Sequence, residues 1–242
     1  MNNIPSVTAE QMAEVDRIMV RKIGVDVLQL MEVAGRAVAA FARDRMLSGN
    51  TRGKRVLILC GTGGNGGDGM VAARFLHAWG AAVDVWVSQR PDPNRGVAAH
   101  QLAILERMAL PIVDASTAHA GLTLPGADLV IDALLGFSLS GPPAGTTAAL
   151  IRAANVHPAP VLAVDLPSGL TATEGMPLEP SIRATATLTL ALPKTGLLTD
   201  DARRVTGDLS LADIGVPPEV FRRFGIDIGP LFGQDDVLRV PF

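Results

Sequence analysis

Three apolar stretches of this chain lead into side chains whose oxygen atoms could bind a cation or move a proton. The stretches are 56–60, 128–135 and 161–164, each of a length typical of a strand buried in a sheet. The oxygen-bearing residues in or after them are Asn65, Asp68, Asp132, Asp165 and Ser168. Carboxylate, amide and hydroxyl oxygens are hard ligands, which suit a hard cation better than zinc when backbone carbonyls are added. Because ligands bind beyond the carboxyl ends of parallel strands, we expect these side chains to converge on one crevice.

Each of these residues also has a purely structural explanation. Asp68 could cap a helix, and Asp132 could accept hydrogen bonds from loop amides. Asp165 precedes Leu-Pro-Ser-Gly and could begin a turn, to which the Ser168 hydroxyl could also belong. The combination is more informative than any one residue, because an acid inside or just after an apolar strand is costly unless it meets a partner or a cation.

The stretch 61–69 reads Gly-Thr-Gly-Gly-Asn-Gly-Gly-Asp-Gly, with six glycines in nine residues. It lies between the predicted strand 56–60 and a predicted helix at 70–79, which is the layout of a phosphate-binding turn. Glycines let the backbone approach a ligand, and N–H groups at a helix N-terminus attract anions. The alternative is a glycine-rich turn without a ligand, although a turn needs only one or two glycines.

Strand and helix patterns alternate along the chain, which predicts a mostly parallel sheet covered by helices on both faces. The predicted strands are 56–60, 82–87, 110–113, 128–135, 161–164, 185–192 and 209–211. The predicted helices are one that starts after Thr8 and ends at Gly24, and others at 26–45, 70–79, 94–108 and 146–155. Two extra helices therefore precede the first strand. The alternation of Thr187 and Thr189 with leucines places the strand 185–192 nearer the edge of the sheet.

The size and charge of the chain limit the classes of protein that it can be. With 242 residues, 48% of them hydrophobic, a single α/β domain over residues 1–242 is expected. The net charge of −3 gives no electrostatic basis for binding nucleic acid or an anionic membrane, and no apolar run is long enough to span a bilayer. Residues 1–7 lack the pattern of a secretory signal, and the single Cys60 excludes an internal disulfide. We therefore expect a cytoplasmic protein with no nucleic-acid or membrane partner.

Taken in order, the motifs resemble those of the NAD(P)H-hydrate epimerase family, which is also known as the YjeF N-terminal domain. The matching segments lie at 30–38, 61–69, 164–170, 193–196 and 207–217. They resemble the family's L-M-E-N-A-G helix motif, its G-x-G-N-N-G-G-D-G loop, its D-I/L-P-S-G motif and its two closing segments. At two positions where the family has asparagine, this chain has Val33 in the helix motif and Gly64 in the loop.

This resemblance implies a Rossmann-like, three-layer αβα fold, a homodimer and an isomerase activity. Family members interconvert the R and S forms of NADHX and NADPHX, nicotinamide cofactors damaged by hydration, so that an S-specific dehydratase can repair them. By matching positions, a potassium ion would be held by Asn65, Asp132 and Ser168. The nucleotide substrate would contact Gly64, Asn65, Gly66, Gly67, Asp68, Gly136, Phe137, Ser138, Leu139, Ser140, Gly141, Pro142 and Asp165.

The catalytic residue that we predict is Asp165, because epimerising a hydrated ring carbon requires proton movement beside it. Lys194, in one of the closing segments, is expected either to stabilise an anion or to pair with a carboxylate. The two N-terminal helices are candidates for the dimer interface.

Two other classes of protein stay open at this point. An NADP-dependent oxidoreductase would need an acid after the strand 82–87 to hold the ribose, and this strand instead runs into Ser88, although Arg90 could accept a 2′-phosphate. The chain has no tyrosine, which excludes tyrosine-based hydride transfer. A diverged, non-catalytic nucleotide-binding or scaffold protein would be expected to have lost the acid or the loop asparagine, and both Asp165 and Asn65 are present.

Overall fold

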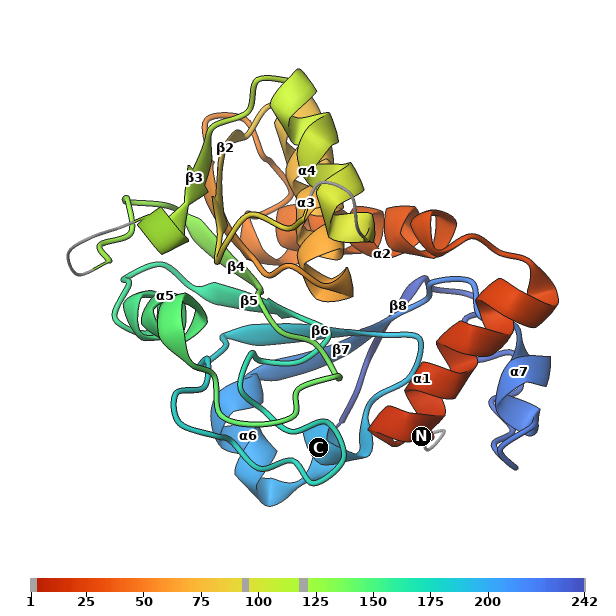
Figure 1. Ribbon diagram of the computed structural model, residues 1–242. Helices are drawn as coiled ribbons and strands as arrows, with labels where there is room; N and C mark the ends of the chain where they lie inside the picture. The colour runs from red at the N-terminus through yellow and green to blue at the C-terminus, as the bar shows by residue number, and fades with distance from the viewer. Residues whose placement is uncertain (1–3, 93–95, 118–121, 242) are drawn as a thin grey trace.

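The computed structural model describes residues 4–92, 96–117 and 122–241, and its centre is an eight-stranded sheet (Figure 1). The strands are β1 (Arg55–Cys60), β2 (Ala82–Val87), β3 (Ile112–Asp114), β4 (Leu129–Ala133), β5 (Val161–Val164), β6 (Ala186–Leu190), β7 (Asp208–Ala212) and β8 (Val237–Arg239). Their order across the sheet is β3-β2-β1-β4-β5-β6-β7-β8. Each neighbouring pair is parallel except β7 and β8, so the mostly parallel sheet expected from the sequence is confirmed.

Helices cover both faces of this sheet (Figure 1). They are α1 (Ala9–Ile18), α2 (Val27–Phe41), α3 (Gly64–Ala78), α4 (Val97–Arg107), α5 (Gly145–Asn155), α6 (Asp200–Thr206) and α7 (Pro218–Arg222). Along β1, Val56 and Ile58 pack in the larger core with α2, α3 and α4, whereas Leu57 and Leu59 pack with α5 in the smaller core. Strand β1 is therefore buried on both faces, as its continuous apolar sequence predicts.

The two helices that precede the sheet begin and end where the sequence predicts. The Thr8 side chain accepts a hydrogen bond from the Gln11 amide, and the Gln11 side chain accepts one from the Thr8 amide. Helix α1 continues as a π-helix, η1 (Met19–Ile23), and ends at Gly24, whose φ of 87° favours glycine. Helix α2 begins with the same reciprocal capping and continues as a second π-helix, η2 (Ala42–Met46).

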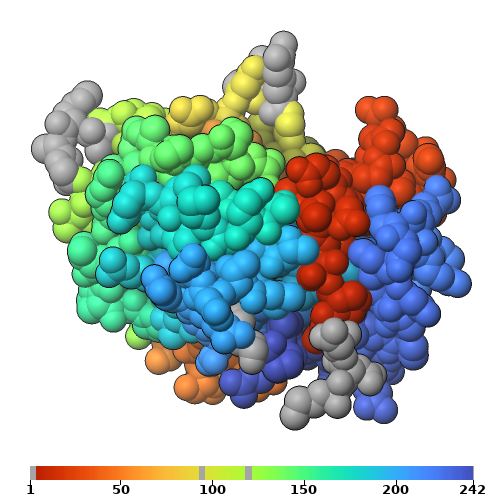
Figure 2. Space-filling view, turned by 90° about the horizontal axis from the view of Figure 1, so that it is seen from below, coloured from red at the N-terminus to blue at the C-terminus, as the bar shows by residue number. Residues whose placement is uncertain are grey.

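The chain that leads into α1 is fixed against the segment that follows β6. The Val7 N–H donates to the Pro193 carbonyl at 2.9 Å, and the Thr195 N–H donates to the Val7 carbonyl at 2.8 Å. The Ala9 N–H donates to Thr173 Oγ1 at 3.0 Å. Figure 2 shows this N-terminal part of the chain, in red, lying between the light-blue and dark-blue parts. Helix α1 is thereby attached to the half of the sheet that the later strands form.

The glycine-rich stretch is mostly helix. Helix α3 begins at Gly64, six residues before the predicted start, although glycine disfavours helix. Close packing explains the difference, because a Cβ atom at Gly69 would lie 2.5 Å from the Ala133 Cβ in β4. The glycines therefore let the start of α3 lie directly on the sheet. Helix α4 begins at Val97, and the first residues of the predicted helix 94–108 lie outside the described part of the chain.

Strand β6 lies inside the sheet, between β5 and β7, and the prediction that it lies nearer the edge is wrong. All five of its residues are buried. The Thr187 hydroxyl donates to the Thr206 carbonyl at 2.7 Å, and the Thr189 hydroxyl donates to Asp165 at 3.2 Å. The threonines that alternate with leucines in β6 are therefore buried, and their hydroxyls have hydrogen-bond partners inside the protein. The sequence pattern is the same for a strand whose threonines face solvent, so it does not distinguish the two cases. Helices α6 and α7 and the antiparallel strand β8 were not predicted.

The described helices and the single cysteine have the following properties. Within the described ranges, no helix combines the length and apolar character needed to cross a bilayer. Cys60 is fully buried in β1, where burial, followed by the negative charge of Asp132, raises the pKa of its thiol. Cys60 therefore acts as a small apolar side chain.

Candidate functional site

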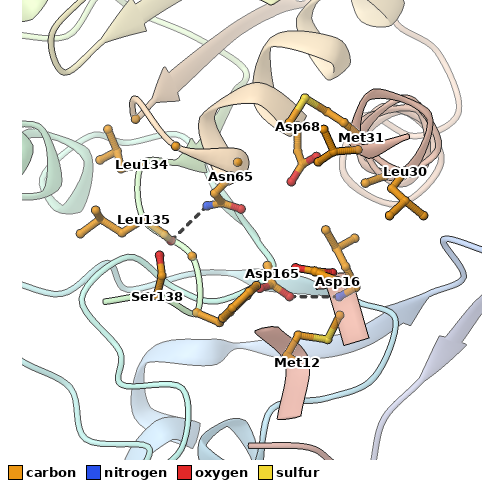
Figure 3. Close-up of a pocket in the computed structure, with 18 of the residues that line it drawn as sticks. Met12, Asp16, Leu30, Met31, Asn65, Asp68, Leu134, Leu135, Ser138 and Asp165 are labelled. Atoms are coloured by element: carbon orange, nitrogen blue, oxygen red, sulfur yellow. Dashed lines mark hydrogen bonds between the residues drawn. The ribbon is translucent and has the colours of Figure 1, made fainter. Parts of the chain in front are cut away.

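A cavity of about 540 Å³ lies at the carboxyl ends of β1, β4 and β5, closed on another side by α1 and α2 (Figure 3). Helix α3 follows β1 on one face of the sheet and α5 follows β4 on the other, so β1 and β4 flank the switch point at which such sheets bind ligands. This volume is typical of small-molecule sites. The lining includes Met12, Asp16, Val20, Leu30, Met31, Gly61, Gly63, Gly64, Asn65, Asp68, Ser88, Leu134, Leu135, Gly136, Phe137, Ser138, Asp165 and Lys194.

The glycines at 61–66, which follow β1 and begin α3, divide into two kinds. A Cβ atom at Gly61 would lie 1.9 Å from the Leu134 carbonyl oxygen, and one at Gly66 would lie 1.9 Å from the Gly61 carbonyl oxygen. Neither position accepts a side chain unless the backbone shifts. A Cβ atom at Gly63 or Gly64 would meet nothing within 4 Å, and both residues are exposed at the cavity. Packing thus explains the first pair, and the second pair leaves the start of α3 open to a ligand.

Asn65 lines the cavity, and hydrogen bonds through the backbone of Leu135 connect it to Ser168 and Asp132 behind the lining. Asn65 Nδ2 donates to the Leu135 carbonyl at 3.0 Å, and the Leu135 N–H donates to Ser168 Oγ at 2.8 Å. The Ser168 hydroxyl donates to Asp132 Oδ1 at 2.6 Å, and the Ser168 N–H donates to Oδ2 at 2.8 Å. The structure therefore brings together the three residues that the sequence assigned to a cation.

The oxygen atoms of this cluster suit a hard monovalent cation. Asn65 Oδ1 is buried and has no hydrogen-bond partner among the residues that the structure describes, which is costly unless a ligand supplies one. One carboxylate, one hydroxyl, one amide oxygen and nearby carbonyls form an all-oxygen set with a single negative charge. Burial raises the pKa of Asp132 to about 6, although hydrogen bonds from Ser168 and from the Leu134 amide lower it. Among the described residues, no group of three His, Cys, Asp or Glu could hold a metal ion, so the set does not resemble a zinc site.

Asp165 and Lys194 form a buried ion pair at one wall of the cavity. Their side chains are 6% and 1% exposed, respectively, and Lys194 Nζ donates both to Asp165 Oδ1 and, at 3.0 Å, to the Leu190 carbonyl. Asp165 Oδ1 also accepts from the Thr189 hydroxyl and from the Leu190 N–H, each at 3.2 Å. Of the two roles considered for Lys194, pairing with a carboxylate is the one observed. These donors hold the Asp165 carboxylate in one orientation beside the cavity.

The backbone at Asp165 is strained. Its φ of 67° is unusual for a residue with a side chain, and the Leu166 N–H donates to the Val164 carbonyl at 2.8 Å across a γ-turn. Ala191 has a φ of 65° and the same pattern of hydrogen bonding directly after the neighbouring strand β6. Such strain is typical of functional sites, where the surrounding structure maintains it. Here the turn directs the Asp165 carboxylate into the cavity, as Figure 3 shows.

Asp68, in the first turns of α3, faces Asp165 across the cavity (Figure 3). Burial raises the pKa of Asp68 well above its usual range, and the charges of Asp165 and Asp16 raise it further, while Lys194 lowers it. Asp68 does not cap a helix, since α3 begins with Gly63 as an N-cap that has no side chain. Each of these raising effects favours the uncharged form of Asp68 over the charged form.

Asp16 is a cavity residue that sequence reasoning missed. It lies on α1, and burial raises the pKa of its carboxyl to about 6, with Lys194 lowering it and Asp165 raising it. Met12 and Val20, four residues to either side, also line the cavity. An acid in line with apolar residues at helical spacing was the available signal. Only the attachment of the chain before α1 to the segment that follows β6 places this acid at the cavity.

The predicted site residues occupy two shells. The cavity lining contains Gly64, Asn65, Asp68, Gly136, Phe137, Ser138 and Asp165. The predicted substrate-binding residues outside that lining are Gly66, Gly67, Leu139, Ser140, Gly141 and Pro142. Gly66 and Gly67 are buried in α3, and Asp132 and Ser168 are fully buried behind the lining.

Comparison with known proteins identifies the family. The sequence profile of the YjeF-related protein N-terminus family matches residues 27–196. This chain belongs to that family. It is 42% identical to an NAD(P)H-hydrate epimerase of Dehalogenimonas lykanthroporepellens, over 92% of this chain and 87% of that protein. It is 35% identical to an NAD(P)H-hydrate epimerase of Rhodopirellula baltica, over 92% of this chain and 89% of that protein. The fold is also similar to the crystal structure of yeast ynu0, with a TM-score of 0.79 and 26% sequence identity. The superposition covers 98% of this chain and 100% of the yeast chain.

This chain differs from the family motifs at Val33 and Gly64. Gly64 lines the cavity at a point with space for a side chain, whereas Val33 is 46% exposed on α2 and lies outside the lining. Arg90, which could have accepted a 2′-phosphate in an oxidoreductase, forms an ion pair with Glu106 and does not line the cavity. The presence of Val33 and Gly64 in place of asparagine leaves the oxygen atoms of Asn65, Asp132, Ser168 and Asp165 in place.

Proposed function

We propose that this chain is an isomerase that interconverts the R and S forms of hydrated NADH and NADPH in the cavity described above. One observation carries the proposal: residues from the glycine-rich loop, from the loop after β4 and from the turn at Asp165 line a single cavity. The glycine-rich loop and the turn at Asp165 belong to two of the family motifs, and the related proteins named as NAD(P)H-hydrate epimerases match nearly the whole chain. An isomerase of this kind catalyses one step in the repair of nicotinamide cofactors.

The start of α3 is the proposed site for the phosphates of the substrate. Its first N–H groups have no side-chain cap, and the exposed backbone at Gly63 and Gly64 leaves space for an anion. The hydrated ring would then lie toward Ser138 and Asp165 on the other side of the cavity.

A potassium ion is the proposed cofactor, held by Asn65, Asp132 and Ser168. The unpartnered Asn65 Oδ1 and the single buried carboxylate of Asp132 support this assignment. When bound, the ion would supply a positive charge that compensates Asp132. Asn65 and Ser168 orient the loop that begins at Leu135, because both form hydrogen bonds to its backbone.

Asp165 is the proposed acid–base residue. It lines the cavity, and Lys194, Thr189 and the Leu190 amide fix its carboxylate. A carboxylate fixed in this way can accept the proton of the ring hydroxyl and later return it.

A homodimer and a cytoplasmic location complete the proposal. The N-terminal helices expose four large apolar side chains, a pattern that favours association with another surface. They are Val20, Ile23, Val27 and Val33. Sedimentation of the wild type and of Val33→Glu tests this point, and a monomeric wild type would exclude the dimer.

The test of the function is the conversion of purified R-NADPHX to the S form. Potassium is present in the reaction, and chromatography measures the two forms over time. We expect conversion well above the spontaneous rate, a loss of about a hundredfold to ten-thousandfold in Asp165→Asn, and none in Asp201→Asn, an exposed aspartate on α6. Undiminished conversion by Asp165→Asn would exclude its acid–base role. If the folded wild type gave only the spontaneous rate, the proposed function would be rejected.

A further inference from the structure

Asp16 is a carboxyl group for which the proposed site has no role. It lies on α1 with its side chain partly buried in the cavity wall, and within the described residues its carboxyl group forms no hydrogen bond or ion pair. Burying a carboxylate without a partner costs stability, so a contribution to the stability of the fold does not explain why Asp16 lies there. An ionisable group with a perturbed environment in a cleft is a candidate for a part in the chemistry.

The position of Asp16 is defined by the fold. Figure 3 shows Asp16 next to Asp165 on one side of the cavity, with Asp68 on the other side. Asp16 interacts electrostatically with both Asp165 and Lys194, which agrees with this placement. The hydrogen bonds that join Val7 to the segment around Lys194 attach α1 to the same wall. The two carboxyl groups therefore come from distant parts of the chain and are held together by the sheet.

We propose that Asp16 is the second proton-transfer group of the epimerisation and acts as the partner of Asp165. This inference rests on the proposed function. It gives a catalytic role to the N-terminal helix, from which no site residue was predicted.

The step balances with these two groups and the substrate alone. The hydrated ring carbon is bonded to the hydroxyl oxygen and to the ring nitrogen. Asp165 accepts the hydroxyl proton, the oxygen forms a carbonyl, and the carbon–nitrogen bond breaks with its electron pair on nitrogen, which takes a proton from Asp16. Rotation about the adjacent carbon–carbon bond presents the other face of the aldehyde. Ring closure re-forms the carbon–nitrogen bond, returns the proton from Asp165 to oxygen, and returns the nitrogen proton to Asp16.

The surroundings of the two carboxyl groups suit these opposite starting states. Asp165 is paired with the Lys194 ammonium and accepts further hydrogen bonds from Thr189 and from the Leu190 N–H. Asp16 has no such donor, and burial raises its pKa to about 6. The ionisable groups that face Asp16 are Asp165 and Lys194 beside it and Asp68 across the cavity. Two carboxyls in environments that favour different protonation states are the pattern of an acid–base pair.

The test compares the wild type with Asp16→Asn, Asp16→Glu and Glu14→Gln in the R-to-S assay with potassium present. Glu14 is on the same helix, pairs with Arg17 and does not line the cavity, so its variant is the matched control. In Asp16→Asn we expect kcat to fall by about a hundredfold to ten-thousandfold, while KM stays within about threefold. Asp16→Glu is expected to regain part of kcat, and the limb of the pH–rate profile near pH 6 is expected to disappear in Asp16→Asn.

Each outcome decides one point. An Asp16→Asn variant that keeps kcat within about tenfold of wild type, or keeps the same pH–rate profile, overturns the inference but leaves the epimerase function intact. An inactive wild type that is folded overturns both. A rise in KM alone would assign Asp16 to binding and also overturn the catalytic role. In water labelled with heavy oxygen, a single turnover should leave the hydroxyl oxygen of the substrate in place, and its replacement in every product molecule would overturn the ring-opening step.

Discussion

Replacing Asp16 with asparagine should stabilise the protein at neutral pH, and the gain should disappear in acid. Burial raises the pKa of Asp16 from an ordinary value of 3.8 to about 6. Between these values the folded protein keeps a proton that the unfolded chain releases, so stability falls as the pH rises through this window. Asparagine carries no proton to release, and its side chain has nearly the same shape, so the variant lacks this loss.

The size of the effect follows from the pKa. One pKa unit corresponds to about 1.4 kcal/mol, so the full difference is worth about 3 kcal/mol above pH 7. Asp16 is only partly buried, and solvent screening reduces the expected gain of Asp16→Asn to about 1–2 kcal/mol. If Asp16 is catalytic, the same substitution trades activity for stability.

The assay is urea unfolding of the wild type and of Asp16→Asn, measured by circular dichroism at several pH values from 4 to 8. The difference in unfolding free energy should grow by about 1–2 kcal/mol across this range, and most of the growth should occur below about pH 6.5. Met12→Leu, at a neighbouring lining position with no ionisable group, is the control and should differ from wild type by a constant amount. A difference for Asp16→Asn that stays constant, or shrinks as the pH rises, would refute the reasoning.

Three further predictions concern the other parts of the site. Gly66→Ala should lose about 1–3 kcal/mol of stability in urea unfolding, because its Cβ would lie 1.9 Å from a backbone oxygen, whereas Gly64→Ala, with nothing within 4 Å, should be neutral or gain up to about 1 kcal/mol; equal effects would contradict the packing argument. Potassium chloride should raise the melting temperature of the wild type relative to choline chloride, by the equivalent of about 2.7 kcal/mol at a hundred times Kd, and should not do so in Asn65→Leu; an equal shift in both proteins would argue against the site. Lys194→Met should lose epimerase activity and about 3–5 kcal/mol of stability in urea unfolding, because Asp165 would stay buried without its cation. A variant as stable as the wild type would contradict this role of the ion pair.

Local patterns in the sequence were enough to predict most of the elements and the motif residues. The apolar run 56–60 predicts a strand buried on both faces, and the capping residues Thr8 and Gln11 predict the start of α1. These signals succeed because they depend on neighbours in the chain. The oxygen-bearing residues Asn65, Asp132, Asp165 and Ser168 also stand out locally, because each follows or interrupts an apolar run.

Contacts between distant segments decided the rest. The start of α3 at Gly64 depends on strand β4, against which its glycines pack, and the interior place of β6 depends on β7 and its buried partners. Asp16 is an ordinary helical acid in the sequence, and it enters the cavity only because α1 is attached beside Lys194. The sequence by itself therefore determined which side chains are available and where most of the strands and helices lie. Only the tertiary structure decided which of these side chains share one cavity, because that depends on contacts between residues far apart in the chain.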